Sequence, residues 1–179
     1  MISAKSLLLG GLLLLAVAPG AGGASGPLSA KSVPAQKAAD VPDAYTVSGH
    51  FTRIVVARMK NQVDMLVGLR AALAREKIRN AVILSGAGSL VSYHVHVVSN
   101  TTLPATEAFF KGEGPFDLVT ANGYIIEGRV HCHITFSNPE KSLGGHLEPG
   151  TRVFTFAIIT LGVLDDATSL KRFDDSSWR

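Results

Sequence analysis

Histidines gather in three short segments of this 179-residue chain, and their spacing suggests a divalent-metal site. His131 and His133 flank Cys132, and on a β-strand the two imidazoles would share one face while the cysteine points away. His146 follows two glycines further along, where a sharp turn would carry it back over the preceding strand. Three neutral imidazoles suit Zn²⁺ and leave a fourth position open for water or substrate. His131, His133 and His146 are therefore our candidate metal ligands, and zinc is the ion we expect.

The residues around these histidines leave several alternatives open. Glu148 lies two positions after His146, where its carboxylate could act as a general acid or base, although an exposed glutamate without a catalytic role is the common case. A His-x-His pair can also be plain polar strand surface. His94 and His96 share a strand face too, but the sequence does not fix their partner strand, so they either join the site or lie on solvated surface. Cys132, which points away from the histidines, is expected to be buried and inert.

The elements that must position these residues form a sheet-rich domain with one helix. Asn61 as N-cap, with Asp64 in a capping-box-like position, predicts a helix that ends near Glu76. The segments Ser85–Ser89 and Asn122-Gly123 are predicted to be turns. A β-α-β-β order predicts an α+β fold, a mixed and mainly antiparallel sheet packed by one principal helix. The strands we expect span 49–59, 78–84, 90–99, 116–121, 124–127, 129–137 and 151–164.

The N-terminal segment has the features of a secretory signal peptide. Lys5 supplies the positive charge, and an apolar run of about 12 residues precedes small residues that end near Ala24. A spanning helix needs roughly 20 apolar residues, so we expect an exported protein, periplasmic or extracellular, with no transmembrane span after cleavage. An uncleaved anchor is the alternative. The predicted organisation is a signal peptide at 1–24, a flexible linker at 25–44, a folded domain at 45–164 and a charged tail at 165–179.

Composition excludes several classes of protein. The chain has 17 Lys and Arg against 14 Asp and Glu, a formal net charge of +3, whereas a dedicated nucleic-acid binder usually carries a denser basic stripe. Cys132 is the single cysteine, so the chain has neither an intrachain disulfide framework nor a cysteine-rich zinc finger. Hydrophobic residues make up 46% of the chain, which excludes a wholly disordered protein.

The chain carries the short motifs Gly86-Ala-Gly-Ser-Leu90, His131-Cys-His133, and Gly144-Gly-His-Leu147 followed by Gly150-Thr-Arg-Val-Phe154. Together these motifs resemble the PPC (plants and prokaryotes conserved) domain family over roughly residues 49–164. The resemblance implies a compact α+β domain that assembles as a homotrimer. The fold is also similar to that of acetolactate decarboxylase, in which a His-x-His pair and a later histidine hold zinc. That similarity implies the same role for His131, His133 and His146, but it does not carry over a substrate.

The resemblance leads to three functional hypotheses, and whether the protein is an enzyme stays open. The first is an exported, trimeric PPC-domain protein whose histidine site binds a small ligand or performs metal-assisted chemistry. The second is a metal-free oligomeric interaction module. The third is a DNA-associated regulator, because plant members of the family carry AT-hooks and act in the nucleus. This chain has no Arg-Gly-Arg-Pro core and begins like an exported protein, so DNA binding is the least favoured.

Overall fold

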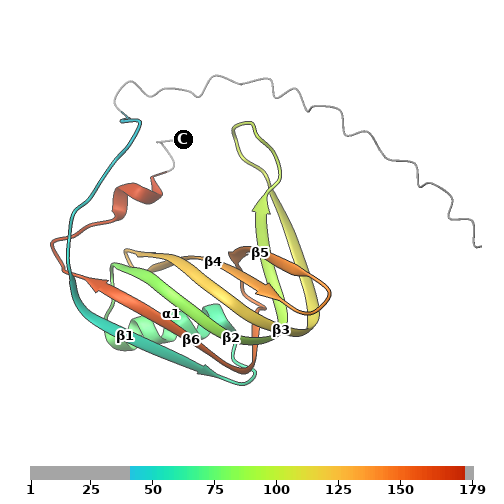
Figure 1. Ribbon diagram of the computed structural model, residues 1–179. Coiled ribbons are helices and arrows are strands. Elements are labelled where there is room, and N and C mark those ends of the chain that lie inside the picture. Colours follow the sequence, from blue (N-terminus) through green and yellow to red (C-terminus); the bar gives the residue numbers. More distant parts are fainter. Residues whose placement is uncertain (1–40, 176–179) are drawn as a thin grey trace, which may run out of the picture. The chain divides into compact units, whose positions relative to one another are not determined.

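The computed structural model describes residues 41–175, which form one antiparallel sheet with a single α-helix against it (Figure 1). The predicted signal peptide and most of the predicted linker lie outside the described residues. In chain order the elements are β1 (Phe51–Lys60), α1 (Met65–Glu76), β2 (Ala81–Val98), β3 (Glu107–Ile126), β4 (Arg129–Ser137), β5 (Ser142–Leu147), β6 (Arg152–Leu164) and the 3-10 helix η1 (Lys171–Asp174).

The six strands lie in the order β1-β6-β2-β3-β4-β5, with a further pairing between β2 and β5. The expectation of one helix on a mainly antiparallel sheet is confirmed, but the molecule is mainly β, and within residues 41–175 each of these pairings is antiparallel, not mixed. The β1-α1-β2 crossover does leave β1 and β2 running the same way. They do not pair because β6, from the end of the domain, lies between them and is antiparallel to both.

Helix α1 begins later than the sequence predicts. Asp64 is the N-cap, and its carboxylate accepts a hydrogen bond from the backbone N–H of Val67, which satisfies a donor of the first turn. The prediction of Asn61 as N-cap is wrong, because its side-chain amide donates to the backbone carbonyl of Phe154 in β6 instead. The buried face of the helix, Met65, Leu66, Leu69 and Leu73, belongs to the main hydrophobic core.

Two predicted turns prove to be the middles of long strands. Residues Ser85–Ser89 lie inside β2, and Asn122-Gly123 lies inside β3. The glycine serves close packing: a Cβ on Gly123 would lie 2.1 Å from the carbonyl oxygen of His131 in β4. The actual turn between β3 and β4 is Glu127-Gly128, where φ is 50° and 78°. Positive φ at both central residues is what a type I′ hairpin turn requires.

Gly123 gives a stability test of this strand packing. Gly123→Ala is expected to lower the free energy of unfolding by about 1–3 kcal/mol or more, because it adds a backbone clash to the strain of a side chain at positive φ. Gly114→Ala is the matched control, since φ is 140° there against 138° at Gly123 but the nearest atom to its Cβ would lie 3.4 Å away. Urea denaturation of both variants measures the difference, and equal losses would contradict this account of Gly123.

Strand β5 closes β2, β3, β4 and β5 into a ring, because it pairs with β4 on one side and β2 on the other. The prediction of a sharp turn at Gly144-Gly145 is wrong, as both glycines lie within β5. Cβ atoms there would lie 2.7 Å from the carbonyl oxygen of Ile134 and 2.6 Å from that of His96. The two glycines therefore let β5 fit between β4 and β2, which brings His146 next to the other histidines.

The inside of this ring is filled by an aromatic cluster. Tyr93 packs against Phe136 and Phe116 with ring centroids 4.7 Å and 5.3 Å away, and Phe116 meets Phe136 edge-on at 5.4 Å. Such contacts add to the stabilisation from apolar burial. Beyond the ring, the ends of β2 and β3 continue as a projecting hairpin, residues 97–108, which we call the arm (Figure 1).

After β6 the chain returns along the domain. Thr168 and Leu170 are buried, so part of the predicted tail packs against the domain. None of the helices within residues 41–175 has the length and apolar character needed to cross a membrane.

Candidate metal centre

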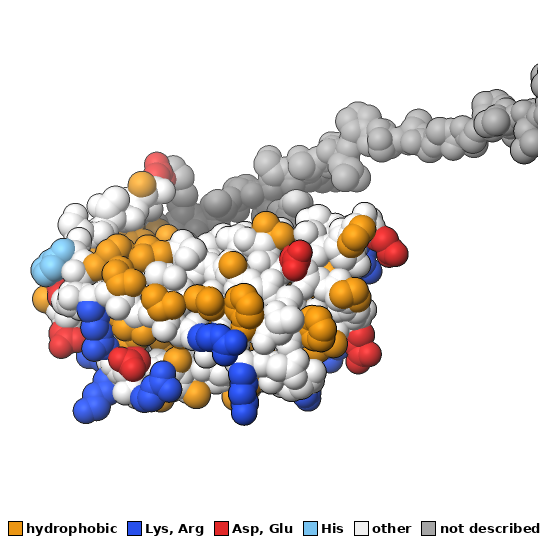
Figure 2. Space-filling model, turned by 60° about the horizontal axis from the view of Figure 1, so that its bottom comes forward, with side chains coloured by type: hydrophobic (Ala, Val, Ile, Leu, Met, Phe, Trp, Pro, Cys, Tyr) orange, Lys and Arg blue, Asp and Glu red, His pale blue; other side chains and the backbone are white. Residues whose placement is uncertain are grey.

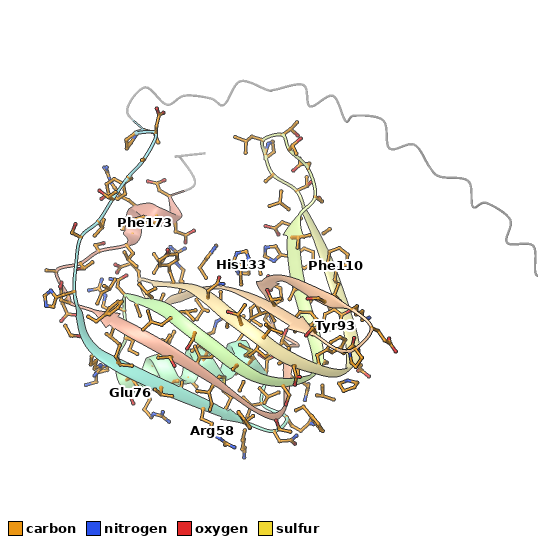
Figure 3. The ribbon with its side chains drawn as sticks, viewed as in Figure 1. Arg58, Glu76, Tyr93, Phe110, His133 and Phe173 are labelled. Carbon is orange, nitrogen blue, oxygen red and sulfur yellow. The ribbon has the colours of Figure 1, made fainter. Side chains whose placement is uncertain are left out.

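The structure brings together the three histidines that the sequence singles out. Along β4, His131 and His133 point to the exposed face while Cys132 points into the core. His146 on β5 is the register partner of His133. One nitrogen atom from each of the three rings lies within 4.8 Å of the others. Figure 3 shows His133 on the side of the sheet toward which the arm projects.

The donor set fits a divalent ion with a preference for nitrogen ligands. Tetrahedral zinc with Zn–N distances of 2.0–2.1 Å holds its ligand nitrogens about 3.4 Å apart. The observed nitrogens lie within 4.8 Å of one another, and His131 and His133 are exposed, so side-chain rotations can bring the three nitrogens to this spacing. The three residues can therefore hold a metal with one coordination position left open.

A fourth histidine lies against this group. His96 on β2 is the register partner of His146, and the two rings stack with centroids 4.6 Å apart. Its Nδ1 lies 2.7 Å from Oε1 of Glu148, and its Nε2 lies 3.7 Å from Oε1 of Glu107. Glu148 is thus bound to His96, and it orients an imidazole beside the candidate ligands.

The remaining histidines lie outside this arrangement. Nδ1 of His94 is 2.7 Å from the carbonyl oxygen of Pro149, and His50 pairs with Asp165 at 3.2 Å. His94 and His96, which the sequence left undecided together, therefore differ: His96 borders the group and His94 does not. Cys132 is buried, and burial raises the pKa of its thiol to about 12, in keeping with an inert cysteine.

Burial and mutual repulsion keep the central imidazole neutral. Desolvation and the neighbouring His131, His96 and His133 lower the pKa of His146 to about 4, although Glu148 opposes the shift. Desolvation, with His131 and His96, also lowers the pKa of His133. Metal binding needs the neutral form of histidine. At neutral pH these two rings therefore offer unprotonated nitrogens without a proton to displace.

The lowered pKa of His146 predicts a pH-dependent stability of the metal-free protein. Between pH 6.5 and about 4, His146 is protonated in the unfolded chain but stays neutral in the folded chain. The free energy of unfolding therefore falls as the pH falls through this window. Melting temperatures measured with a chelator at pH 7.5 to 4.5 should decline less steeply for His146→Gln than for the wild type. His50→Gln removes an exposed histidine and serves as control. Parallel curves for wild type and His146→Gln would contradict the assignment.

An open pocket of about 610 Å³ adjoins the candidate ligands, a size suited to a small molecule. Five of its lining residues are charged or potential metal ligands: Arg70, Arg129, His131, His146, and Asp174 from η1. The pocket lies where β4 is paired with β3 on one side only, because β5 pairs with β4 only from His133 onward. It gives the exposed side of the histidine group access to solvent and to small molecules.

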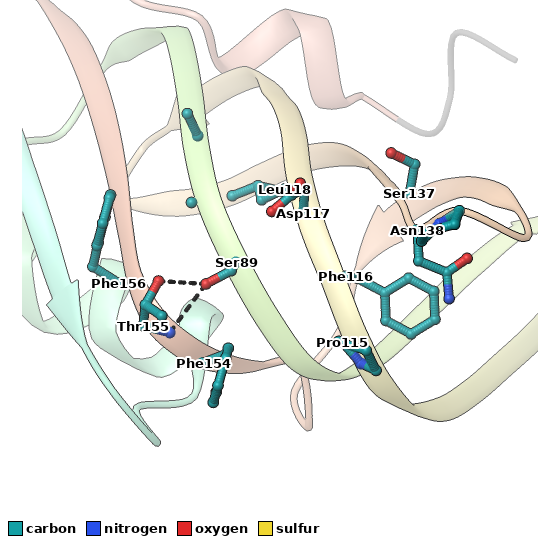
Figure 4. Close-up of a pocket in the computed structure, with 13 residues that line it drawn as sticks. Ser89, Pro115, Phe116, Asp117, Leu118, Ser137, Asn138, Phe154, Thr155 and Phe156 are labelled. Atoms are coloured by element: carbon teal, nitrogen blue, oxygen red, sulfur yellow. Dashed lines mark hydrogen bonds between the residues drawn. The ribbon is translucent and has the colours of Figure 1, made fainter.

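A second hollow of about 590 Å³ lies between β2, β3 and β6, away from the histidines (Figure 4). Phe154 and Phe156 of β6 line it, and the hydroxyl of Ser89 accepts a hydrogen bond from the backbone N–H of Thr155 at 3.0 Å. Asp117 is the one residue among those lining this hollow that is a histidine, cysteine, aspartate or glutamate, so the hollow has no group of ligands for a metal ion.

The antiparallel sheet, the single helix and the histidine group define a small α+β domain with a candidate metal centre. The chain belongs to the Plants and Prokaryotes Conserved (PCC) domain family, whose domain matches residues 46–165. This confirms the family that the sequence motifs indicate. No curated protein sequence matches the chain.

Solved structures share the fold at low sequence identity. A plant- and prokaryote-conserved protein from Pyrococcus horikoshii is 22% identical with a TM-score of 0.58, over 68% of this chain and 85% of that one. A metal-containing protein from Archaeoglobus fulgidus is 16% identical with a TM-score of 0.58, over 67% and 86%. A protein from Bacteroides thetaiotaomicron described as DNA-binding is 18% identical with a TM-score of 0.53, over 67% and 82%. At these identities the likeness shows the fold alone.

Proposed function

We propose that this protein is an exported, trimeric PCC-domain protein that holds a divalent metal ion on His131, His133 and His146. Zinc is the ion that we favour. The proposal rests on one observation above all, the meeting of three imidazole nitrogens within 4.8 Å on an exposed sheet face. The lowered pKa of His146 supports it, because this ring is neutral and ready to bind at physiological pH. The metal-containing relative with the same fold is in line with it.

The arrangement suits small-ligand binding or metal-assisted chemistry. A zinc ion with three imidazole ligands supplies a Lewis acid with one open position. The chain itself supplies the rest: His146 is fixed between β4 and β2, and Glu148 orients His96 by a 2.7 Å hydrogen bond beside it. A carboxylate-bound imidazole of this kind can hold or pass a proton beside His146. Glu148 would then act through His96.

Titration of the metal-free protein with zinc tests the proposal. Isothermal titration calorimetry should show about one zinc bound per chain, and cobalt should bind at the same stoichiometry with the visible absorption of a four-coordinate site. His94→Ala should bind both ions like the wild type, because His94 lies outside the group. Absence of saturable binding in the wild type would refute the metal centre.

The exposed sheet face supports assembly into the proposed trimer. Hydrophobic side chains gather on this face of the domain, with lysines and arginines near them (Figure 2). Monomeric proteins rarely expose large contiguous apolar surfaces, so a patch of this kind is typical of an interface. A second copy of the same chain is the occupant we propose. The exposed residues concerned are Ile54 and Val56 on β1, Leu84 on β2, Val119 on β3, and Phe154 and Phe156 on β6.

The same apolar face favours the second candidate, a metal-free interaction module in which the histidines are only surface. Zinc stoichiometry separates the two, since a module of that kind would assemble without binding metal. DNA binding is the weakest candidate, because the formal net charge is only +3 over the whole chain. A tight, salt-sensitive affinity for duplex DNA would revive it.

Export is a further part of the proposal and rests on the first 24 residues of the sequence. Expression of the full chain in a secreting bacterial host should yield a mature protein outside the cytoplasm that has lost residues up to about Ala24. The intact mass of the purified protein reports the cleavage directly. A full-length protein confined to the cytoplasm would contradict export.

A further inference from the structure

We infer that the pocket beside the histidine group takes a small ligand that carries an oxyanion, a carboxylate or a phosphate, with Arg129 as its anchor. The inference rests on the proposed metal centre and adds to it the chemical class of the ligand. It is carried by the sequence of side chains along one strand face and by the charges that line the pocket.

Arg129, His131 and His133 form an Arg-x-His-x-His pattern along the exposed face of β4. Because side chains alternate, the guanidinium emerges on the same face as the two imidazoles, and residues two apart on a strand are separated by about 6.7 Å. An arginine side chain easily covers such a distance. Arg129 therefore stands one strand repeat from the candidate ligands, on the side where β4 has no partner strand.

The pocket already holds an oxyanion on this arginine. Asp174 of η1 places its Oδ2 2.8 Å from a terminal guanidinium nitrogen of Arg129. The guanidinium side chain is 65% exposed, and it has five N–H donors, so it can bind further oxygen atoms. A carboxylate from the chain's own tail thus occupies the position that we assign to the ligand's anion.

The charges of the pocket favour an anion over a neutral ligand or a cation. Its lining includes two arginines, Arg70 from α1 and Arg129 from β4, against the single carboxylate of Asp174. A bound divalent ion would add to this positive field. A ligand that places one oxygen at the open metal position and an anionic group at Arg129 would interact with both positive centres. Because Arg129 lies one strand repeat from the candidate metal ligands, only a few atoms can separate these two groups of the ligand. Arginine binds carboxylate and phosphate with paired, charge-assisted hydrogen bonds.

Calorimetric titration of the zinc-loaded full chain with malonate, and separately with inorganic phosphate, tests the inference. At least one of the two should bind saturably, and the stronger identifies which oxyanion the pocket prefers. Arg129→Gln should weaken that binding about tenfold or more, a loss of about 1.4 kcal/mol, while zinc stoichiometry stays at the wild-type value. Malonamide, the neutral analogue of malonate, should bind far more weakly.

Two further variants separate a specific effect from damage to the pocket. Asp174→Asn should strengthen binding severalfold, because it removes the carboxylate that competes for Arg129. Arg75→Gln removes a positive charge on α1 that lies outside the pocket lining and should leave binding unchanged. If zinc binds but neither anion does, or if Arg129→Gln binds the anion as tightly as the wild type, the inference fails and the metal centre stands. If zinc does not bind at all, the metal centre fails and the inference fails with it.

Discussion

Replacing His146 with alanine is expected to abolish stoichiometric zinc binding while the domain stays folded. His146 is the one candidate ligand that does not lie on β4, so its loss leaves two imidazoles on a single strand. Loss of a residue that only supports a metal ligand typically costs 10–100-fold in affinity, and loss of a ligand itself should exceed about 100-fold. Zinc occupancy after dialysis should fall from about one per chain to near zero.

The structure explains why the fold should survive this substitution. His146 is partly exposed, and the core of the ring is made by the aromatic cluster and Leu147, which the substitution leaves in place. Circular dichroism and thermal melting of the metal-free variant measure this. His94→Ala is the matched control, since it removes a strand imidazole outside the group and should retain zinc. If the folded His146→Ala variant still holds about one zinc per chain, His146 is not a metal ligand.

The second large effect is expected on assembly. Val56→Asp should convert the proposed trimer to a monomer at micromolar concentrations, because it places a charge on the apolar sheet face. Val56 is 62% exposed in the isolated chain, on β1 between Ile54 and Arg58. Burial of an unpaired carboxylate in a subunit interface is costly, and it outweighs what a single valine contributes to association. Light scattering coupled to size-exclusion chromatography measures the mass of each species.

The arm provides the matched control for this substitution. Val98 is 63% exposed and lies at the end of β2, away from the β1 and β6 surface. Val98→Asp carries the same chemical change at the same exposure and should leave the trimer intact. A wild-type protein of monomeric mass would refute the trimer. If Val98→Asp is monomeric and Val56→Asp is still trimeric, the subunit interface lies on the arm and not on the apolar sheet face.

The sequence predicts part of the site because strand periodicity is a local property. Alternation along β4 is enough to place His131 and His133 together and to turn Cys132 inward. The observed strand, Arg129–Ser137, has the predicted bounds. Local patterning also indicates the sheet-rich composition and the single helix, since both follow from runs of apolar residues and their period.

What the sequence could not show depends on contacts between distant strands. The stacking of His96 on His146 exists only because β5 pairs with β2 as well as β4, and the residues that allow this, Gly144 and Gly145, have the local signature of a turn. Asn122-Gly123 also has the local signature of a turn, although it lies inside β3. Glycine marks both turns and close backbone approach, and only the tertiary register distinguishes them. The Arg129–Asp174 pair likewise depends on how the tail returns across the domain.

The most direct test of the metal centre is the elemental content of the untagged, mature protein. Inductively coupled plasma mass spectrometry on the wild type and on His131→Ala, purified without chelators, counts the metal per chain. The account predicts about one zinc per wild-type chain and its loss in the variant. Absence of metal from both proteins, even after zinc is offered, would contradict the metal centre and leave the domain as an interaction module.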